Sequence, residues 1–421
     1  MKSMKALVVA VVGLVIVGAC GRVPGQVTAG DYKLYEAAST GSSQQLSIID
    51  SRSHAVERNL PLGTPSPGWT HLYALKGDTL VDLDPLTGTA LNQIRLRGSN
   101  YMLPPATLSG VPGGLSPNGR WLVLESFDRD SNGVPTATHL LLVDTTYMAQ
   151  PRPIDLAGFY QFDAVNNAGT SVYLIEYLST GQYFVRFFNV PLGALDPTIV
   201  FDKSDGSAAM AGVRLSGVAS HDGSWLYSVY VRPDKSAFIH ALSLDNPIAF
   251  CLDLPGTGYS TNPDEFQWSL ALNADGSHLY AANGATGVVA DVTFSSGWPN
   301  SQIRTGRIAT GSTATAGPFV QEAQAKEMGG NAAAVSADGR TLVIGGKAGL
   351  LWVDTASLTV HDQQLASWKV WSLAISPDGT TVYAVNDSGM IGELAMAGKH
   401  ASTTFGGADG QPLALVRVSA N

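Results

Sequence analysis

Charged residues are scarce in this chain of 421 residues. Asp, Glu, Lys and Arg make up 14% of it, against about 25% in an average soluble domain. The acidic residues outnumber the basic ones by 34 to 25, which gives a formal net charge of −9. Because the sequence has no basic stripe that would neutralise a phosphate backbone, nucleic acid is not an expected partner.

Cysteine is also nearly absent, since only Cys20 and Cys251 occur. The two residues lie in segments with different expected fates, so no structural disulfide is predicted. Cys251 belongs to the apolar run 249–252, where it is either a small buried hydrophobic residue or a reactive thiol, and the run favours the first interpretation.

Linear catalytic motifs are missing as well. The sequence contains no Gly-x-Ser-x-Gly, no His-Glu-x-x-His and no phosphate-binding glycine loop between a strand and a helix. An acid–base pair assembled from distant loops would leave no such motif. Glu125, Glu176 and Glu265 are candidates for carboxylates that point into a channel, as a propeller enzyme with a channel metal would require.

The first residues predict export. Lys2 and Lys5 precede an apolar stretch, residues 6–19, which is shorter than the ~20 residues of a membrane-spanning helix and is typical of a signal peptide. It ends in Val17-Gly18-Ala19-Cys20, which resembles the bacterial lipobox. The resemblance implies a signal peptide over 1–19, a Cys20 carrying acyl chains such as palmitate, and a flexible tether over 20–30.

The alternatives at this terminus are ordinary secretory cleavage near Ala19 and retention as a short membrane anchor. With lipidation, the protein is expected on the outer face of the cell membrane or on the outer membrane. The sequence does not decide whether the envelope has one membrane or two.

A short motif recurs along the rest of the chain. Each copy has Ser or Asn, then usually an Asp-Gly or Asn-Gly pair, then alternating apolar residues. Copies begin at Ser66, Ser116, Asn166, Ser220, Asn273, Ser336 and Ser376. Ser and Asp side chains bond to the local backbone and Gly accepts a positive φ, so each copy predicts a β-hairpin.

A second turn recurs at Asp84, Asp144 and Asp354, and again after Asp50. Each unit therefore holds about four strands in about 40 to 60 residues, the period of propeller blades. The pattern resembles the bacterial YVTN-type and TolB-like repeats, which are WD40-like, and this implies an all-β fold, a β-propeller spanning residues 31–421.

The number of blades is eight if a strand over 412–418 pairs with strands over 32–37 and 45–50 to close the ring. Seven blades is the alternative, because the second unit has little sequence for an innermost strand.

Function is expected on the face that carries the second-to-third strand loops and the connections between blades. These loops are predicted to be long at 97–113, 126–138, 257–267 and 309–330. Binding candidates are the aromatic and charged residues near the predicted channel mouth, with the alternative that the tryptophans pack between blades. They are Tyr101, Tyr259, Glu265, Trp268, Trp368, Lys369 and Trp371.

One segment resembles half of a calcium loop, with Asp128, Asp130 and Asn132 as candidate ligands. His139 stands where an EF-hand would place a bidentate Glu, which excludes an EF-hand. A polar hairpin without metal is the favoured alternative, so no cofactor is expected, with calcium as the one candidate.

These observations predict a monomeric, membrane-anchored propeller that acts as a non-catalytic binding module for a protein, peptide or glycan. The bilayer is its other partner, through Cys20. The alternative is an extracytoplasmic enzyme, a lactonase or lyase with a metal in the channel.

Overall fold

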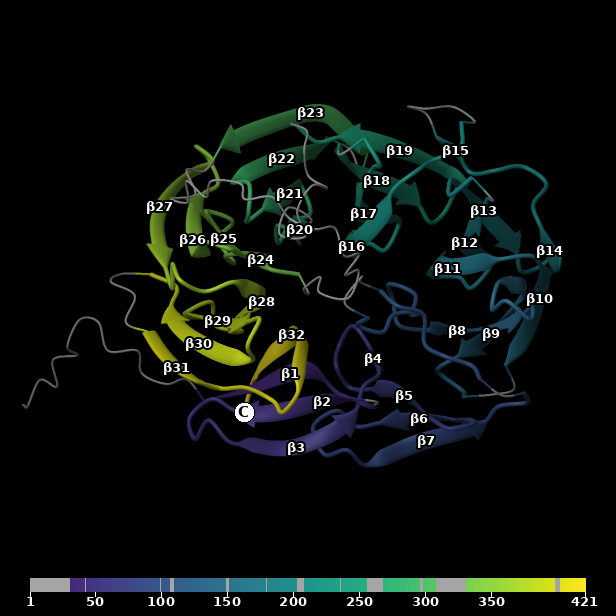
Figure 1. Ribbon diagram of the computed structural model, residues 1–421, viewed down its shortest axis with the longest axis horizontal. Coiled ribbons are helices and arrows are strands. Elements are labelled where there is room, and N and C mark those ends of the chain that lie inside the picture. The colour runs from purple at the N-terminus through teal and green to yellow at the C-terminus, as the bar shows by residue number, and fades with distance from the viewer. Residues whose placement is uncertain are drawn as a thin grey trace, which may run out of the picture.

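The structure is a computed structural model of the chain. It describes residues 31–41, 43–98, 100–106, 110–148, 151–178, 180–202, 208–234, 236–255, 268–295, 298–307, 331–397 and 402–421. Within these ranges every regular element is a β-strand, and the strands form eight sheets arranged as a ring (Figure 1). The prediction of an all-β propeller is confirmed, and the blades number eight rather than seven.

The first four blades run from the N-terminus as follows. Blade 1 has β1 (Tyr32–Thr40), β2 (Ser43–Asp50) and β3 (Val56–Pro61); blade 2 has β4 (Thr64–Pro65), β5 (Leu72–Lys76), β6 (Thr79–Leu83) and β7 (Ala90–Arg95); blade 3 has β8 (Trp121–Arg129), β9 (Pro135–Asp144) and β10 (Arg152–Ala157); blade 4 has β11 (Tyr160–Val165), β12 (Ser171–Tyr177), β13 (Tyr183–Asn189) and β14 (Ala194–Leu195).

The last four blades follow the same order. Blade 5 has β15 (Phe201–Asp202), β16 (Val213–Ala219), β17 (Trp225–Val231), β18 (Ala237–Ser243) and β19 (Ile248–Asp253); blade 6 has β20 (Trp268–Leu272), β21 (His278–Asn283), β22 (Val288–Ser295) and β23 (Trp298–Arg307); blade 7 has β24 (Ala333–Val335), β25 (Thr341–Gly346), β26 (Gly349–Asp354) and β27 (Thr359–Gln364); blade 8 has β28 (Val370–Ile375), β29 (Thr381–Asn386), β30 (Met390–Ala395) and β31 (Ser402–Gly406), and the chain returns to blade 1 with β32 (Gln411–Ala420).

Blade 1 closes the ring with strands from both ends of the described chain. β32 pairs antiparallel with β1, from Tyr32 opposite Ala420 to Ser39 opposite Gln411. The innermost position is therefore filled by the C-terminal strand and the outer three by N-terminal ones (Figure 1). The ring closure predicted from the sequence is confirmed, and it removes two exposed sheet edges.

The recurring turn forms as its residues predict. In blade 7, Ser336 Oγ accepts the Thr341 N–H at 3.0 Å and donates to Asp338 Oδ1 at 2.6 Å. The same carboxylate oxygen accepts the Arg340 N–H at 3.1 Å, and Gly339 has a φ of 71°. These contacts fix the tight turn between the first two strands of the blade.

Apolar side chains fill the spaces between neighbouring blades. One such cluster joins Val229 and Ile239 of blade 5 to Leu270 and Leu279 of blade 6. Because each sheet buries both faces against its neighbours, the core of the protein is a ring of interblade layers.

Departures from the regular pattern are found in blades 2, 3 and 5, among others. In blade 2 the innermost strand, β4, has two residues, as the sparse sequence there predicts. In blade 3 an isolated bridge, Leu115 opposite Leu122, stands at the inner position. Blade 5 carries a fifth strand, because β15 joins the outer strand β19 in parallel.

The prediction of a long irregular loop over 126–138 is wrong. β8 and β9 continue as a long antiparallel pair, with Arg129 opposite Pro135, so the connection is confined to residues 130–134. Thr136, Ala137 and Thr138 belong to β9, so the strand extends into the segment that its polar residues suggested was a loop.

None of the described residues forms an apolar helix of membrane-spanning length.

Candidate functional site

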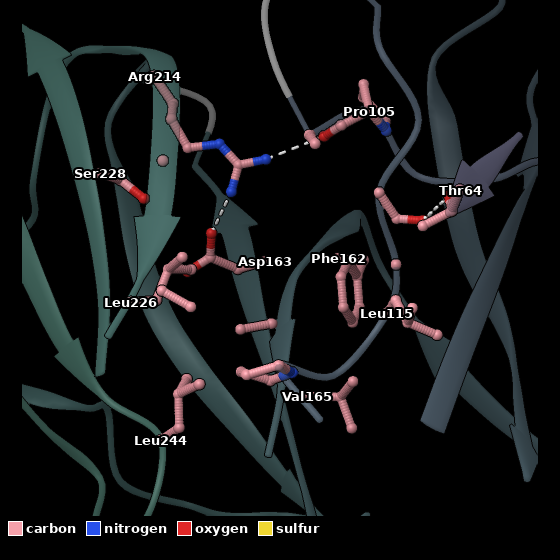
Figure 2. Close-up of a pocket in the computed structure, with 17 residues that line it drawn as sticks. Thr64, Pro105, Leu115, Phe162, Asp163, Val165, Arg214, Leu226, Ser228 and Leu244 are labelled. Atoms are coloured by element: carbon pink, nitrogen blue, oxygen red, sulfur yellow. Dashed lines mark hydrogen bonds and ion pairs between the residues drawn. The ribbon is translucent and has the colours of Figure 1, made fainter. Parts of the chain in front are cut away.

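A cavity of about 190 Å³ lies where the inner parts of blades 3, 4 and 5 meet (Figure 2). Phe162 and Asp163 reach it from β11, Arg214 from β16 and Ser228 from β17, while Pro105 approaches from the segment before β8. The wall is mostly apolar, and its charged groups stand together at one end.

The charged groups are Arg214 and Asp163, which pair across the boundary between blades 4 and 5. Arg214 Nη1 lies 2.5 Å from Asp163 Oδ1, and Nη2 donates to the Pro105 carbonyl at 3.0 Å (Figure 2). Burial disfavours the charged guanidinium, but the Asp163 carboxylate more than offsets this and raises the pKa of Arg214. Through Asp163, Arg214 and the Pro105 carbonyl, this contact joins blades 3, 4 and 5.

A second cavity of about 320 Å³ adjoins the first one at Arg214. Arg214, Pro105 and Phe162 line both cavities. The second one also contacts Tyr177 and Tyr183, at the end of β12 and the start of β13. Because second strands end on the face opposite the Asp-Gly turns, this cavity belongs to the face with the second-to-third strand loops, here called the loop face.

A series of aromatic rings crosses the loop face from blade 3 to blade 5, here called the aromatic series. Successive rings have centroids 5.0 to 6.3 Å apart, in stacked, tilted or edge-on contacts. Its members are Phe127, Phe159, Tyr177, Tyr183, Tyr230 and Phe238.

The aromatic series is exposed at one part and buried at another. Tyr177 is 41% exposed, whereas Tyr183 and Tyr230 are 2% and 3% exposed. Tyr177 donates a hydrogen bond to Gln161 Oε1 at 2.9 Å. Sequence reasoning missed this surface, although Phe127, Tyr177 and Tyr230 all fall near the end of a second strand, a repeated placement that could have indicated it.

The candidate carboxylates of an enzyme have separate partners. Glu125 is 1% exposed and accepts the Phe162 N–H at 3.1 Å, and burial raises its pKa to about 7. Glu176 accepts hydrogen bonds from Arg186 at 2.6 Å and from the Tyr160 hydroxyl at 3.2 Å. Glu265 lies outside the described residues.

The tryptophans among the predicted binding residues are buried or half-buried. Trp268 and Trp371 are 3% and 5% exposed, and Trp368 packs against the cluster of blades 7 and 8. Lys369 Nζ lies 5.5 Å from the centre of the Trp371 ring. For the tryptophans, the structure favours the packing interpretation.

Of the remaining binding candidates from the sequence, only Tyr101 lies among the described residues. Tyr101 is half-buried against the cluster between blades 2 and 3. Tyr259 and Cys20 lie outside the described residues.

The candidate calcium loop closes the β8–β9 hairpin. Asp130 Oδ1 accepts the N–H groups of Asn132 and Val134, both at 2.9 Å. Asp128 Oδ2 lies 3.1 Å from His139 Nε2. Because these contacts already engage both carboxylates, they account for the polar residues as parts of a turn, and calcium binding stays a prediction.

One group of potential metal ligands does converge among the described residues. It consists of Asp202, His240 and Cys251, and the sequence analysis did not connect them. Cys251 is buried, as its apolar context predicts.

No protein-family model matches this chain, and no curated protein sequence matches it significantly. Solved structures do align with it. AztD from Citrobacter koseri, in its apo form, has 9% sequence identity and a TM-score of 0.52, and the alignment covers 92% of this chain and 97% of that one. The dihydro-heme d1 dehydrogenase NirN in complex with DHE has 13% identity and a TM-score of 0.51, covering 95% of this chain and 77% of that one.

The periplasmic gluconolactonase PpgL of Pseudomonas aeruginosa aligns over 91% of this chain and 97% of its own, with 17% identity and a TM-score of 0.44. Identities this low show the fold alone, because one propeller architecture supports many unrelated activities. The alignments with AztD and NirN therefore support the fold of the chain and leave its function to the residues of its own surface.

Proposed function

We propose that this protein is an exported, lipid-anchored β-propeller that binds a protein or peptide partner on its loop face and acts as a non-catalytic module. The observation that carries the proposal is the aromatic series, which brings the exposed Tyr177 to the edge of the cavity of about 320 Å³. Gln161 and Arg214 supply polar groups in the same cavity.

Aromatic and arginine side chains around a pocket are the residues that carry most binding energy in protein interfaces. A cavity of this size is at the small end of ligand sites, so it suits one inserted side chain of a larger partner. A glycan is the alternative ligand, and the loss or retention of binding after removal of the partner's carbohydrate would distinguish the two.

The binding surface is tested with two tyrosine variants of the full chain. Tyr177→Ala removes the exposed ring beside the cavity, whereas Tyr147→Ala removes a 69% exposed tyrosine in the β9–β10 turn, on the opposite face. For a partner isolated from envelope extract, we expect affinity to fall about 30-fold or more in the first variant and to be unchanged in the second. Equal affinities for both variants would refute the proposal.

The anchor is tested at Cys20. Cys20→Ser removes the thiol that would accept the lipid, so we expect the protein to move from the membrane fraction to the soluble fraction of the envelope. A Cys251→Ser chain serves as control, since that thiol is buried in the propeller, and it should stay with the membrane. Unchanged fractionation of the Cys20→Ser chain would contradict lipidation.

The enzyme alternative keeps the resemblance to YVTN-type and TolB-like repeats but assigns the channel a catalytic metal. Its test is hydrolysis of lactones, or elimination from acidic sugars, by the purified chain with added divalent ions. Turnover that Tyr177→Ala does not affect would replace the binding proposal with the enzymatic one.

A further inference from the structure

Three polar side chains face one another on the side of blade 5 that packs against blade 4. Cys251 Sγ lies 3.0 Å from Asp202 Oδ2 and 3.8 Å from His240 Nδ1. His240 Nδ1 lies 3.9 Å from Asp202 Oδ2. The three atoms thus form a small triangle, here called the Asp-His-Cys cluster.

The strand pairing of blade 5 creates this arrangement. His240 on β18 stands directly opposite Cys251 on β19, so their side chains leave the sheet on the same face. The fifth strand, β15, then joins β19 in parallel and places Asp202 opposite Ala249. The additional strand therefore supplies the third member of the cluster.

The cluster is buried in an apolar layer. Asp202, His240 and Cys251 are 4%, 2% and 9% exposed, and Tyr183 and Tyr230 belong to the layer around them. His240 therefore stands among apolar side chains and aromatic rings, with its ring edge-on to Tyr230 at 6.1 Å between centroids. Neutral imidazole is the form that binds a metal ion.

The geometry differs from that of a nucleophilic triad. In a triad the carboxylate orients the ring nitrogen that points away from the nucleophile. Here the thiol and the carboxylate both face Nδ1 of His240, while Nε2 is buried and has no hydrogen-bond partner in the described part of the chain. Three donor groups that converge on one point are instead the arrangement of a metal site.

The distances support the same conclusion. Around tetrahedral zinc, bonds of about 2.3 Å to sulfur and about 2.0 to 2.1 Å to nitrogen or oxygen separate neighbouring ligand atoms by about 3.3 to 3.6 Å. The observed separations of 3.0, 3.8 and 3.9 Å lie on both sides of this range. Displacements of about half an ångström, within ordinary side-chain adjustment, would bring all three to it.

We propose that Asp202, His240 and Cys251 bind one Zn²⁺ ion, with water as the fourth ligand. On binding, the Cys251 thiol loses its proton to solvent and the thiolate sulfur bonds to the metal. One carboxylate and one thiolate then balance the two positive charges, which makes the loaded site neutral inside its apolar layer. The site packs against Tyr183 and Tyr230 of the aromatic series, but zinc binding there does not depend on the function proposed for the surface at Tyr177.

The test uses the full chain carrying Cys20→Ser, which removes the only other thiol. The probes are Zn²⁺ alone, counted per chain by native mass spectrometry, and Co²⁺ alone, followed by its thiolate charge-transfer absorption. We expect one ion per chain and a thiolate band, both lost in Cys251→Ala. His278→Gln is the matched control, because His278 Nδ1 pairs with Asp291 at 2.8 Å in blade 6 without a cysteine, and it should retain both signals.

A folding defect is separated from a binding defect by a second measurement. We expect Zn²⁺ to raise the unfolding temperature of the Cys20→Ser chain, since a ligand that binds only the folded state stabilises it. In the milder Asp202→Asn variant, the addition of Zn²⁺ should leave the unfolding temperature nearly unchanged. If the Cys20→Ser chain binds no zinc, or if Cys251→Ala retains one zinc and the same temperature shift, the proposal is overturned.

Discussion

The Glu36 carboxyl makes the stability of the ring-closing blade depend on pH. Glu36 lies on β1 and is 0% exposed; Oε2 accepts the Ala408 N–H at 2.6 Å, and Oε1 has no hydrogen-bond partner among the described residues. Burial raises its pKa from 4.5 to about 7, although the Ala408 N–H opposes this. The folded state therefore binds a proton more tightly than the unfolded state does.

The sign and size of the effect follow from proton linkage. Below pH 4.5 both states are protonated and the stability contribution is complete; it is lost as pH rises toward and through about 7. The full difference corresponds to about 3 kcal/mol in the free energy of unfolding. Glu36→Gln keeps an oxygen that accepts the Ala408 N–H but cannot ionise, so this loss should disappear.

The assay is urea unfolding of wild type and Glu36→Gln between pH 5 and pH 8. We expect the free energy of unfolding of the variant to increase relative to that of wild type as pH rises, by up to about 3 kcal/mol at pH 8. Glu57→Gln is the control, because Glu57 is a partly exposed carboxylate paired with Lys33, and its difference from wild type should stay constant from pH 6 to pH 8. Parallel profiles for Glu36→Gln and wild type would refute the reasoning.

Three further predictions concern the turns, the acid limit and the closing strand. Gly169→Ala should lower the free energy of unfolding by about 2 to 4 kcal/mol, because Gly169 has a φ of 68° and a Cβ there would stand 2.3 Å from the Trp121 ring. Gly181 has a φ of 79° and open space around it, so Gly181→Ala should lower it by about half as much in the same urea titration. Hydrogen bonds from Ser53, with Lys33 beside it, hold the pKa of Asp50 well below 3.8, so the stability that Asp50 contributes should be lost as pH falls below about 4. The unfolding temperature of Asp50→Asn should therefore differ less from that of wild type at pH 3 than at pH 6, and an equal difference would contradict this. Deleting residues 411–421 should expose the inner edge of β1 and produce aggregates on size-exclusion chromatography, whereas a soluble monomer would show that the ring does not need this strand.

The sequence predicted the architecture well because its turns are local. Ser336, Asp338 and Gly339 fix a hairpin through contacts within five residues, and the repetition of such turns reports the number of blades. The prediction of a loop over 126–138 was wrong because strand pairing depends on residues of both strands. β8 and β9 pair as far as Arg129 and Pro135, so only residues 130–134 form the connection.

The candidate sites could not be predicted because they are built from residues far apart in the chain. Asp163 and Arg214 stand on different blades, and their contact depends on how two sheets pack. His240 and Cys251 face each other because of the exact register of one hairpin, which the sequence pattern leaves open. The short β15, two residues long, carries too little periodicity to be recognised as the strand that supplies Asp202.

The pairing of β32 with β1 has a consequence for the order of folding. Blade 1 combines β1, β2 and β3 with β32, which follows them only after the strands of the seven other sheets, so the blade is completed after those sheets have been synthesised. The entropy cost of joining such distant segments grows only slowly with their separation, but the search for the correct pairing is slow for contacts this distant in sequence. We therefore expect a late, rate-limiting docking step, during which the partly assembled blade is the part of the molecule that most needs protection from other chains.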